Sequence, residues 1–192
     1  DPKKITGMSA EEILSLFYEN TTFKRNDYGW VFKENLSFYK SKILGYDILN
    51  SSNGKILISK GTKVNQKIIN EIKKKNISNL TIEENSLIGF YLASDIIDEK
   101  TGKIFYEAGF EIDEDFINFT NNNKINKLDI LKVDNIEIGS YLRNTLQLDK
   151  ARSREEALFE VFKILRPGEP PTIETAETLF NNLFFNTDRY DL

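Results

Sequence analysis

Short runs of hydrophobic residues in the middle of the chain alternate with turn-forming residues. Residues 46–49 and 55–59 are two such β-prone runs. Asn53-Gly54 lies between them and supplies the positive φ angles that a tight hairpin turn requires. Ile68, Ile69 and Ile72 then fall on one face of a helix expected over about residues 65–75, and a strand is expected at residues 80–82. The pattern predicts a β-hairpin, a helix and a closing strand.

The same pattern occurs a second time, which makes this part of the chain an internal repeat. Residues 47–82 align without gaps on residues 95–130, so that Gly54 matches Gly102 and Gly61 matches Gly109. The second copy predicts a turn at residues 99–102, a helix at about 113–122 and a strand at 128–131. We therefore expect an α+β fold in which a helical segment is interrupted by two β-hairpin-helix-strand repeats.

Helical patterns flank the repeats on both sides. Ser9 with Glu12 and Ser153 with Glu156 each have the spacing of a capping box that opens an amphipathic helix. Between residues 23 and 42, six aromatic residues fit strands that lead into the first repeat, with a turn at residues 27–29. These aromatic residues are Phe23, Tyr28, Trp30, Phe32, Phe38 and Tyr39. Core packing explains them better than base stacking does.

A proline-rich connector follows the second flanking helix. Pro167 ends that helix and favours an extended backbone at Arg166, Pro170-Pro171 stiffens the exit, and Thr172 can cap the next helix. Such a connector would hold Arg166 and Glu169 in fixed positions for binding. The alternative is a sharp corner between two helices with an arginine at a helix C-terminus. The residues alone favour the corner.

Composition excludes several kinds of chemistry. The 192 residues include neither Cys nor His, which excludes disulfides, zinc sites of the usual ligand set, thiol chemistry and histidine bases. The net charge of -4 argues against wholesale coating of nucleic acid. The longest apolar run, residues 87–93, is far shorter than the ~20 residues that span a bilayer, and we expect a cytoplasmic protein. The first residue is Asp1 rather than Met, which suggests a piece of a longer chain.

The two repeats carry opposite charge. The first has seven Lys against two acids, a net +5, and the second has four Lys against nine acids, a net -5. Lys73-Lys74-Lys75 can be interpreted as a contact for nucleic acid or an acidic partner, but cations at a helix C-terminus are the commoner explanation. Asp113-Glu114-Asp115 suggests a cation site, yet acids are ordinary in a first helical turn.

The last third of the chain closely resembles the beta subunit of bacterial DNA-directed RNA polymerase. The resemblance is carried by Ile138-Gly139-Ser140-Tyr141-Leu142, Arg166-Pro167-Gly168-Glu169-Pro170-Pro171-Thr172, Ala176-Glu177, Leu179-Phe180, Leu183-Phe184-Phe185 and Arg189-Tyr190-Asp191-Leu192. The helix opened by Met8-Ser9 resembles the second lobe of that subunit, and the repeats resemble an insertion within the lobe. This implies a discontinuous lobe segment, residues 1–22 and 150–192, and an insertion domain, residues 23–149.

The resemblance implies a fragment without a catalytic centre in an enzyme that is a nucleotidyltransferase. The lobe would form one wall of the DNA cleft in transcription, with Arg166, Glu169 and Arg189 near the nontemplate strand. No cofactor is implied for this segment, because the family's Mg²⁺ is bound by another subunit. Implied partners are the other polymerase subunits, sigma factor, promoter and downstream DNA, and a DksA-type regulator at the insertion; a membrane is not among them.

Two other functions stay open on the residues. The repeats could form a protein-interaction module that docks transcription regulators. A hydrolase that uses carboxylates is disfavoured, because no pair of acids is marked by a catalytic motif.

Overall fold

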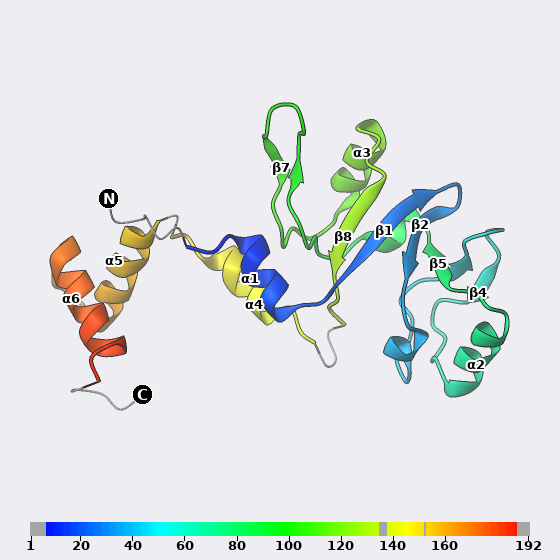
Figure 1. Cartoon of the computed structure of the whole chain (residues 1–192), viewed down its shortest axis with the longest axis horizontal. Coiled ribbons are helices and arrows are strands. Elements are labelled where there is room, and N and C mark those ends of the chain that lie inside the picture. The colour runs from blue at the N-terminus through cyan, green and yellow to red at the C-terminus, as the bar shows by residue number, and fades with distance from the viewer. Residues whose placement is uncertain (1–6, 135–137, 152, 188–192) are drawn as a thin grey trace. The chain divides into compact units, whose positions relative to one another are not determined.

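The computed structural model describes residues 7–134, 138–151 and 153–187 (Figure 1). The chain divides into two compact units. One comprises Ser9–Asn144, and the other comprises Asp1–Met8 with Thr145–Leu192. Each unit is described by itself.

The Ser9–Asn144 unit is built on a six-stranded antiparallel sheet with strand order β4-β3-β5-β2-β1-β8. A separate two-stranded hairpin pairs β6 with β7. The helices and strands of the unit are α1 (Ala10–Phe17), β1 (Asn20–Asn26), β2 (Gly29–Lys33), the 3-10 helix η1 (Leu36–Tyr39), β3 (Ile48–Asn50), β4 (Ile56–Ile58), α2 (Gln66–Lys74), β5 (Asn79–Ile82), the 3-10 helix η2 (Glu84–Leu87), β6 (Ile96–Ile97), β7 (Ile104–Tyr106), α3 (Glu114–Asn122) and β8 (Lys127–Leu131).

The β1–β2 hairpin lies within the large sheet, between β5 and the edge strand β8. Gly29 follows its turn with φ +132°, and a Cβ there would lie 2.2 Å from the Ile82 carbonyl oxygen of β5, so only glycine fits. Phe23 and Phe32 face each other across the hairpin with their rings stacked 4.7 Å apart. Trp30 is fully buried, and the Arg25 guanidinium lies 4.7 Å from its ring centroid. Phe23, Trp30 and Phe32 therefore serve the core, as the sequence indicated, whereas Tyr28 in the turn is exposed.

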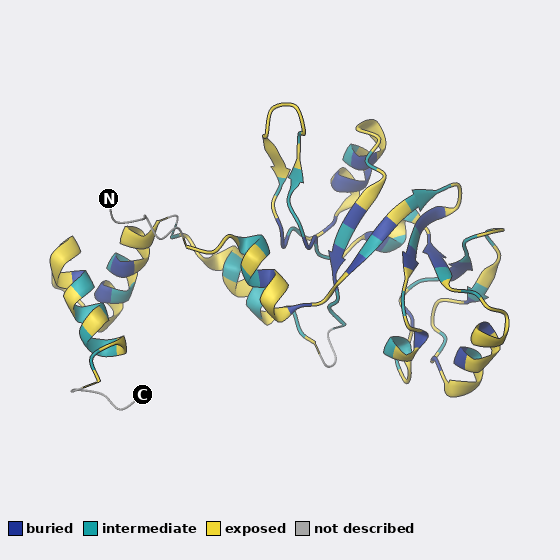
Figure 2. Cartoon of the chain, in the orientation of Figure 1, coloured by how far each residue is buried: buried dark blue, intermediate teal, exposed yellow. Residues whose placement is uncertain are grey.

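One hydrophobic core is shared by the large sheet and by the helices of both repeats (Figure 2). Fully or almost fully buried side chains come from the strands and from both helices, including Ile48, Ile69, Leu80, Phe116 and Leu128. These side chains lie at the apolar positions from which the elements were predicted. Burial of one apolar face by each helix is what holds α2 and α3 in place, because each has only nine residues and would be marginal alone.

Backbone hydrogen bonds recur at the spacing of the sequence repeat. The amide of Gly61 donates to the Leu44 carbonyl, and the amide of Gly109 donates to the Leu92 carbonyl, each at 2.8 Å. Asp47 accepts the Lys60 amide at 2.5 Å as Asp95 accepts the Ala108 amide at 2.7 Å. The correspondence begins before the sequence match, because η1 and η2 also lie at equivalent places.

The helix α1 is joined to the second repeat. Its N-cap Ser9 forms a capping box with Glu12. Glu11 accepts the Asp95 amide at 3.1 Å, and the Tyr18 hydroxyl donates to the Gly139 carbonyl at 3.0 Å. These bonds place α1 within the Ser9–Asn144 unit.

The second unit contains a pair of helices, α5 (Arg154–Leu165) and α6 (Ile173–Phe184). Ser153 caps α5 and Thr172 caps α6, as predicted. Leu158, Phe162 and Ala176 form the small core between the two helices. A further helix, α4 (Tyr141–Leu148), crosses the boundary between the units.

The α+β class is confirmed, and so are the helices predicted at 65–75 and 113–122. The expectation of strands throughout the aromatic segment 23–42 is wrong for Phe38 and Tyr39, which lie in η1. Asn35 accepts the Ser37 amide and thereby starts a 3-10 turn in place of a strand. The division into lobe segments 1–22 and 150–192 and an insertion at 23–149 stays a prediction.

Candidate functional site

The connector between α5 and α6 is a tight corner built by proline and glycine. The Arg166 amide closes α5 by donating to the Phe162 carbonyl at 2.8 Å, and the Glu169 amide donates to the Arg166 carbonyl at 3.2 Å. Gly168 has φ +90°, which favours glycine even though no other atom crowds the position. The corner holds the backbone at Arg166 and at Glu169 in one defined conformation.

The Arg166 side chain is exposed at this corner. Its relative exposure is 56%, that of Glu169 is 60%, and the closest approach of the two charges is 3.7 Å between Nη1 and Oε1. An exposed ion pair at this distance contributes little stability. The guanidinium can therefore exchange Glu169 for a phosphate or an exposed base at small cost.

Arg166 is the least restrained of the four arginines in the described part of the chain. Arg25 donates to Glu84 and Thr120, and Arg143 donates to the Gly109 carbonyl and lies over the Tyr91 ring. Arg154 pairs with Glu177 at 2.5 Å. Arg189, which was also predicted to contact DNA, lies outside the described residues. Sequence reasoning did not single out Arg25 or Arg143, since their partners are distant along the chain.

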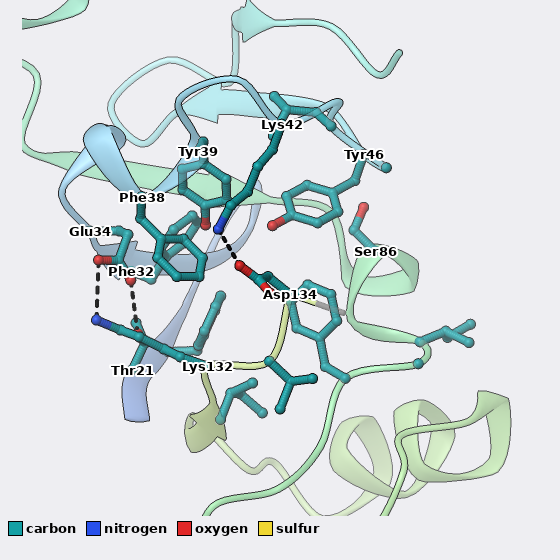
Figure 3. Close-up of a pocket in the computed structure, with 18 of the residues that line it drawn as sticks. Thr21, Phe32, Glu34, Phe38, Tyr39, Lys42, Tyr46, Ser86, Lys132 and Asp134 are labelled. Carbon is teal, nitrogen blue, oxygen red and sulfur yellow. Dashed lines mark hydrogen bonds and ion pairs between the residues drawn. The ribbon is translucent and has the colours of Figure 1, made fainter. Parts of the chain in front are cut away.

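A hollow lies in the Ser9–Asn144 unit, with a volume of about 700 Å³ (Figure 3). Aromatic side chains from β1, β2 and η1 and from the segments that precede the two repeats line it. Lys42 forms an ion pair with Asp134, and its ammonium lies 3.7 Å from the Phe38 ring centroid. Lys132 lies 3.3 Å from Glu34, which also accepts a bond from the Thr21 hydroxyl at 3.1 Å. The ammonium groups of Lys42 and Lys132 are thus already paired.

Two tyrosines that line the hollow, Tyr39 and Tyr46, stay protonated at neutral pH. Burial raises the pKa of Tyr39 well above its usual value, and Tyr46 and Glu34 add to the shift. Burial likewise raises the pKa of Tyr46, against a hydrogen bond with Tyr39 that lowers it. For Lys132, burial lowers the pKa, but Glu19 and Glu34 together outweigh it and the pKa is raised. Protonated phenols and paired charges thus lie side by side in this hollow.

The sequence singled out two charged runs, and the structure places both on helices. Lys73 and Lys74 lie in the last turn of α2, followed by Lys75 as its C-cap. Asp113 is the N-cap of α3 and accepts the Phe116 amide at 2.8 Å, which explains it as a helix cap. Within residues 7–134, 138–151 and 153–187, no group of three acidic side chains is placed to hold a metal ion. No helix in the same ranges has the length and apolar character needed to cross a membrane.

Comparison with known proteins gives one consistent result. No protein-family model matches the chain. DNA-directed RNA polymerase subunit beta from Agrobacterium fabrum is 38% identical over 186 residues, and the subunits of the same name from Brucella canis and Brucella suis are 45% identical over 186 residues. These alignments cover 97% of this chain and 14% of each relative. The chain is therefore homologous, over nearly its whole length, to a segment of the bacterial RNA polymerase beta subunit.

Proposed function

We propose that this chain is a lobe segment of an RNA polymerase beta subunit that forms part of the wall of the DNA cleft during transcription. The observation that supports the proposal best is the similarity to beta subunits across 97% of the chain. The segment acts without a catalytic centre of its own and contributes to nucleotidyl transfer only within the assembled enzyme. Its partners are then the other polymerase subunits, sigma factor and DNA, and the catalytic Mg²⁺ is held by another subunit.

The contact with DNA is assigned to Arg166, with Glu169 in the same connector, and the family resemblance adds Arg189. Arg166 is exposed and only loosely paired, so its guanidinium is available for a bidentate bond to a phosphate or for stacking on a base. The proline-locked corner reduces the conformational freedom that the backbone would lose on binding. One such contact is useful only where other chains already hold the DNA, which fits the net charge of -4.

The test is the lifetime of the open promoter complex in assembled polymerase whose beta subunit carries Arg166→Ala. We expect the lifetime to fall roughly tenfold, because a charge-assisted bond to phosphate contributes about 1.5 kcal/mol or more. Arg166→Lys should give an intermediate lifetime, since lysine keeps the charge but lacks the planar fork.

The matched control is Lys163→Ala on the same helix. Lys163 is also 56% exposed and pairs with Glu160 at 2.8 Å, so its removal changes the charge by the same amount. Its complexes should keep the original lifetime. Equal lifetimes for the original enzyme and Arg166→Ala would exclude Arg166 as a DNA contact.

A further inference from the structure

The first repeat presents an exposed group of lysines that the proposed function does not use. We call Lys60, Lys63, Lys67, Lys73, Lys74 and Lys75 the lysine face. All six are exposed. The ion pairs found among the described residues involve other side chains, so these six charges are not neutralised within the fold.

The second repeat shows that the fold does not require these lysines. The same backbone, 48 residues later, carries Ala108, Glu111, Asp115 and the run Asn121-Asn122-Asn123 at the corresponding positions. The helix α3 has the same nine-residue length as α2 and ends without a basic residue in its last turn. Complementing a helix dipole is therefore insufficient to explain the run at residues 73–75.

The chemistry around the lysines suits phosphate rather than a protein surface. Gln66 and Asn70, which are also exposed on α2, add amide donors, and the apolar residues of the helix face inward, with Ile69 and Ile72 buried. Protein interfaces have an apolar or aromatic centre and are poor in lysine. Contacts to a phosphate backbone come from Lys, Gln and Asn side chains and need no apolar centre.

The spacing along α2 allows contact with several phosphates at once. Lys67 and Lys74 are two turns apart, about 10 Å along the helix axis, and both point away from the buried face. Duplex DNA carries one charge for roughly every 1.7 Å of its axis. The outer surface of α2 (Figure 2) therefore faces more than one phosphate when it lies against a duplex.

We propose that the lysine face binds the phosphate backbone of duplex DNA without regard to sequence. The choice of DNA as the polyanion rests on the proposed function, whereas the site itself rests on the contrast between the two repeats. Binding by the isolated chain is weak and strongly dependent on salt, because it depends on displaced counterions and the whole chain is acidic.

The experiment measures binding of a fluorescent 25-base-pair duplex, in two unrelated sequences, to the 192-residue chain between about 30 and 200 mM KCl. The variant is Lys67→Gln with Lys74→Gln, since glutamine is also a good helix former. The matched control is Lys100→Gln with Lys103→Gln, which removes the same charge from the exposed β6–β7 turn region of the second repeat. Circular dichroism verifies that all three proteins are folded.

The original chain and the control should bind both sequences alike. The Lys67/Lys74 variant should bind at least about tenfold more weakly at low salt, with the slope of log affinity against log salt reduced by about two. Equal affinities of variant and control would overturn the proposal, as would a failure of the original chain to bind.

Preferential binding of poly-glutamate over the duplex would also overturn the proposal and would indicate an acidic protein partner. The result of this duplex-binding experiment is independent of the result of the Arg166→Ala test. A chain whose lysine face fails to bind can still belong to the cleft wall, and a chain that binds duplex here can still lack the Arg166 contact.

Discussion

At the scale of single residues, burial favours the protonated form of two phenols in the hollow beside η1. Tyr39 and Tyr46 both have a pKa raised above the usual value, chiefly by burial. A raised phenol pKa means that the folded state favours the protonated form. The resulting stability is complete below the unfolded pKa of about 10 and is lost as the pH rises through the folded value.

We therefore predict that Tyr39→Phe reduces the amount by which the free energy of unfolding falls at alkaline pH. The free energy of unfolding of the original chain should fall between about pH 9 and pH 11, and that of the variant should fall less, because one phenol no longer has to stay protonated. Lys132 contributes in the same pH range, since its pKa is also raised, so part of the loss remains. Urea unfolding at several pH values measures the difference.

Tyr28→Phe is the control, because Tyr28 is 42% exposed in the turn before β2. Its alkaline loss should equal that of the original chain. Identical curves for all three proteins would contradict the assignment of the pH dependence to the buried phenols.

At the scale of elements, the two repeats use one aspartate each to hold the loop after the hairpin. Asp95 accepts the amide of Ala108, which is 1% exposed, whereas Asp47 accepts the amide of the exposed Lys60. Water can replace the aspartate at Lys60 but reaches Ala108 poorly. An unsatisfied buried amide costs about 1–3 kcal/mol, and an exposed one costs far less.

We expect Asp95→Ala to lower the free energy of unfolding by about 2 kcal/mol and Asp47→Ala by roughly 0.5 kcal/mol. The two substitutions remove the same group from equivalent positions, so each serves as the other's control. Urea unfolding followed by tryptophan fluorescence suits the measurement, because Trp30 is fully buried in the shared core. Equal losses would show that the difference in burial has no energetic effect.

The sequence predicted most accurately those features that depend on a few neighbouring residues, namely helix starts and tight turns. Ser9, Ser153 and Thr172 predicted helix starts that the structure has, because a cap is a local hydrogen bond within four residues. Gly54 and Gly102 predicted hairpin turns, because the positive φ angle of such a turn is also a local property. Phe38 and Tyr39 were misassigned because aromatic residues suit strands, whereas the Asn35 cap decided the local conformation.

Contacts between distant residues could not be predicted in this way. The pair Lys42–Asp134 joins positions 92 residues apart, and Arg25 meets Thr120 across 95 residues. Such pairs leave no periodic pattern in the sequence, because they depend on how the repeats pack against the β1–β2 hairpin. The exposed Arg166 was identified from its proline-rich surroundings and from the family resemblance, while its loose pairing with Glu169 required coordinates.

At the scale of the whole molecule, the chain spans only about 14% of the length of its relatives. Each unit has its own core, and the α5–α6 pair has a small one of three buried side chains. Exposed apolar residues remain in this pair, such as Ile164 on α5 and Phe185 at the C-cap of α6, at 77% and 70% exposure. A surface of this kind is consistent with a segment that functions inside a larger assembly.

The most direct test of the cleft-wall assignment is crosslinking from residue 166 within an assembled polymerase. A photoreactive amino acid replaces Arg166 in the full beta subunit, and a second enzyme carries it at Lys163, which is equally exposed. In open promoter complexes we expect crosslinks from residue 166 to the nontemplate strand near the melted region and few from residue 163. Crosslinks from residue 166 to protein alone would contradict it.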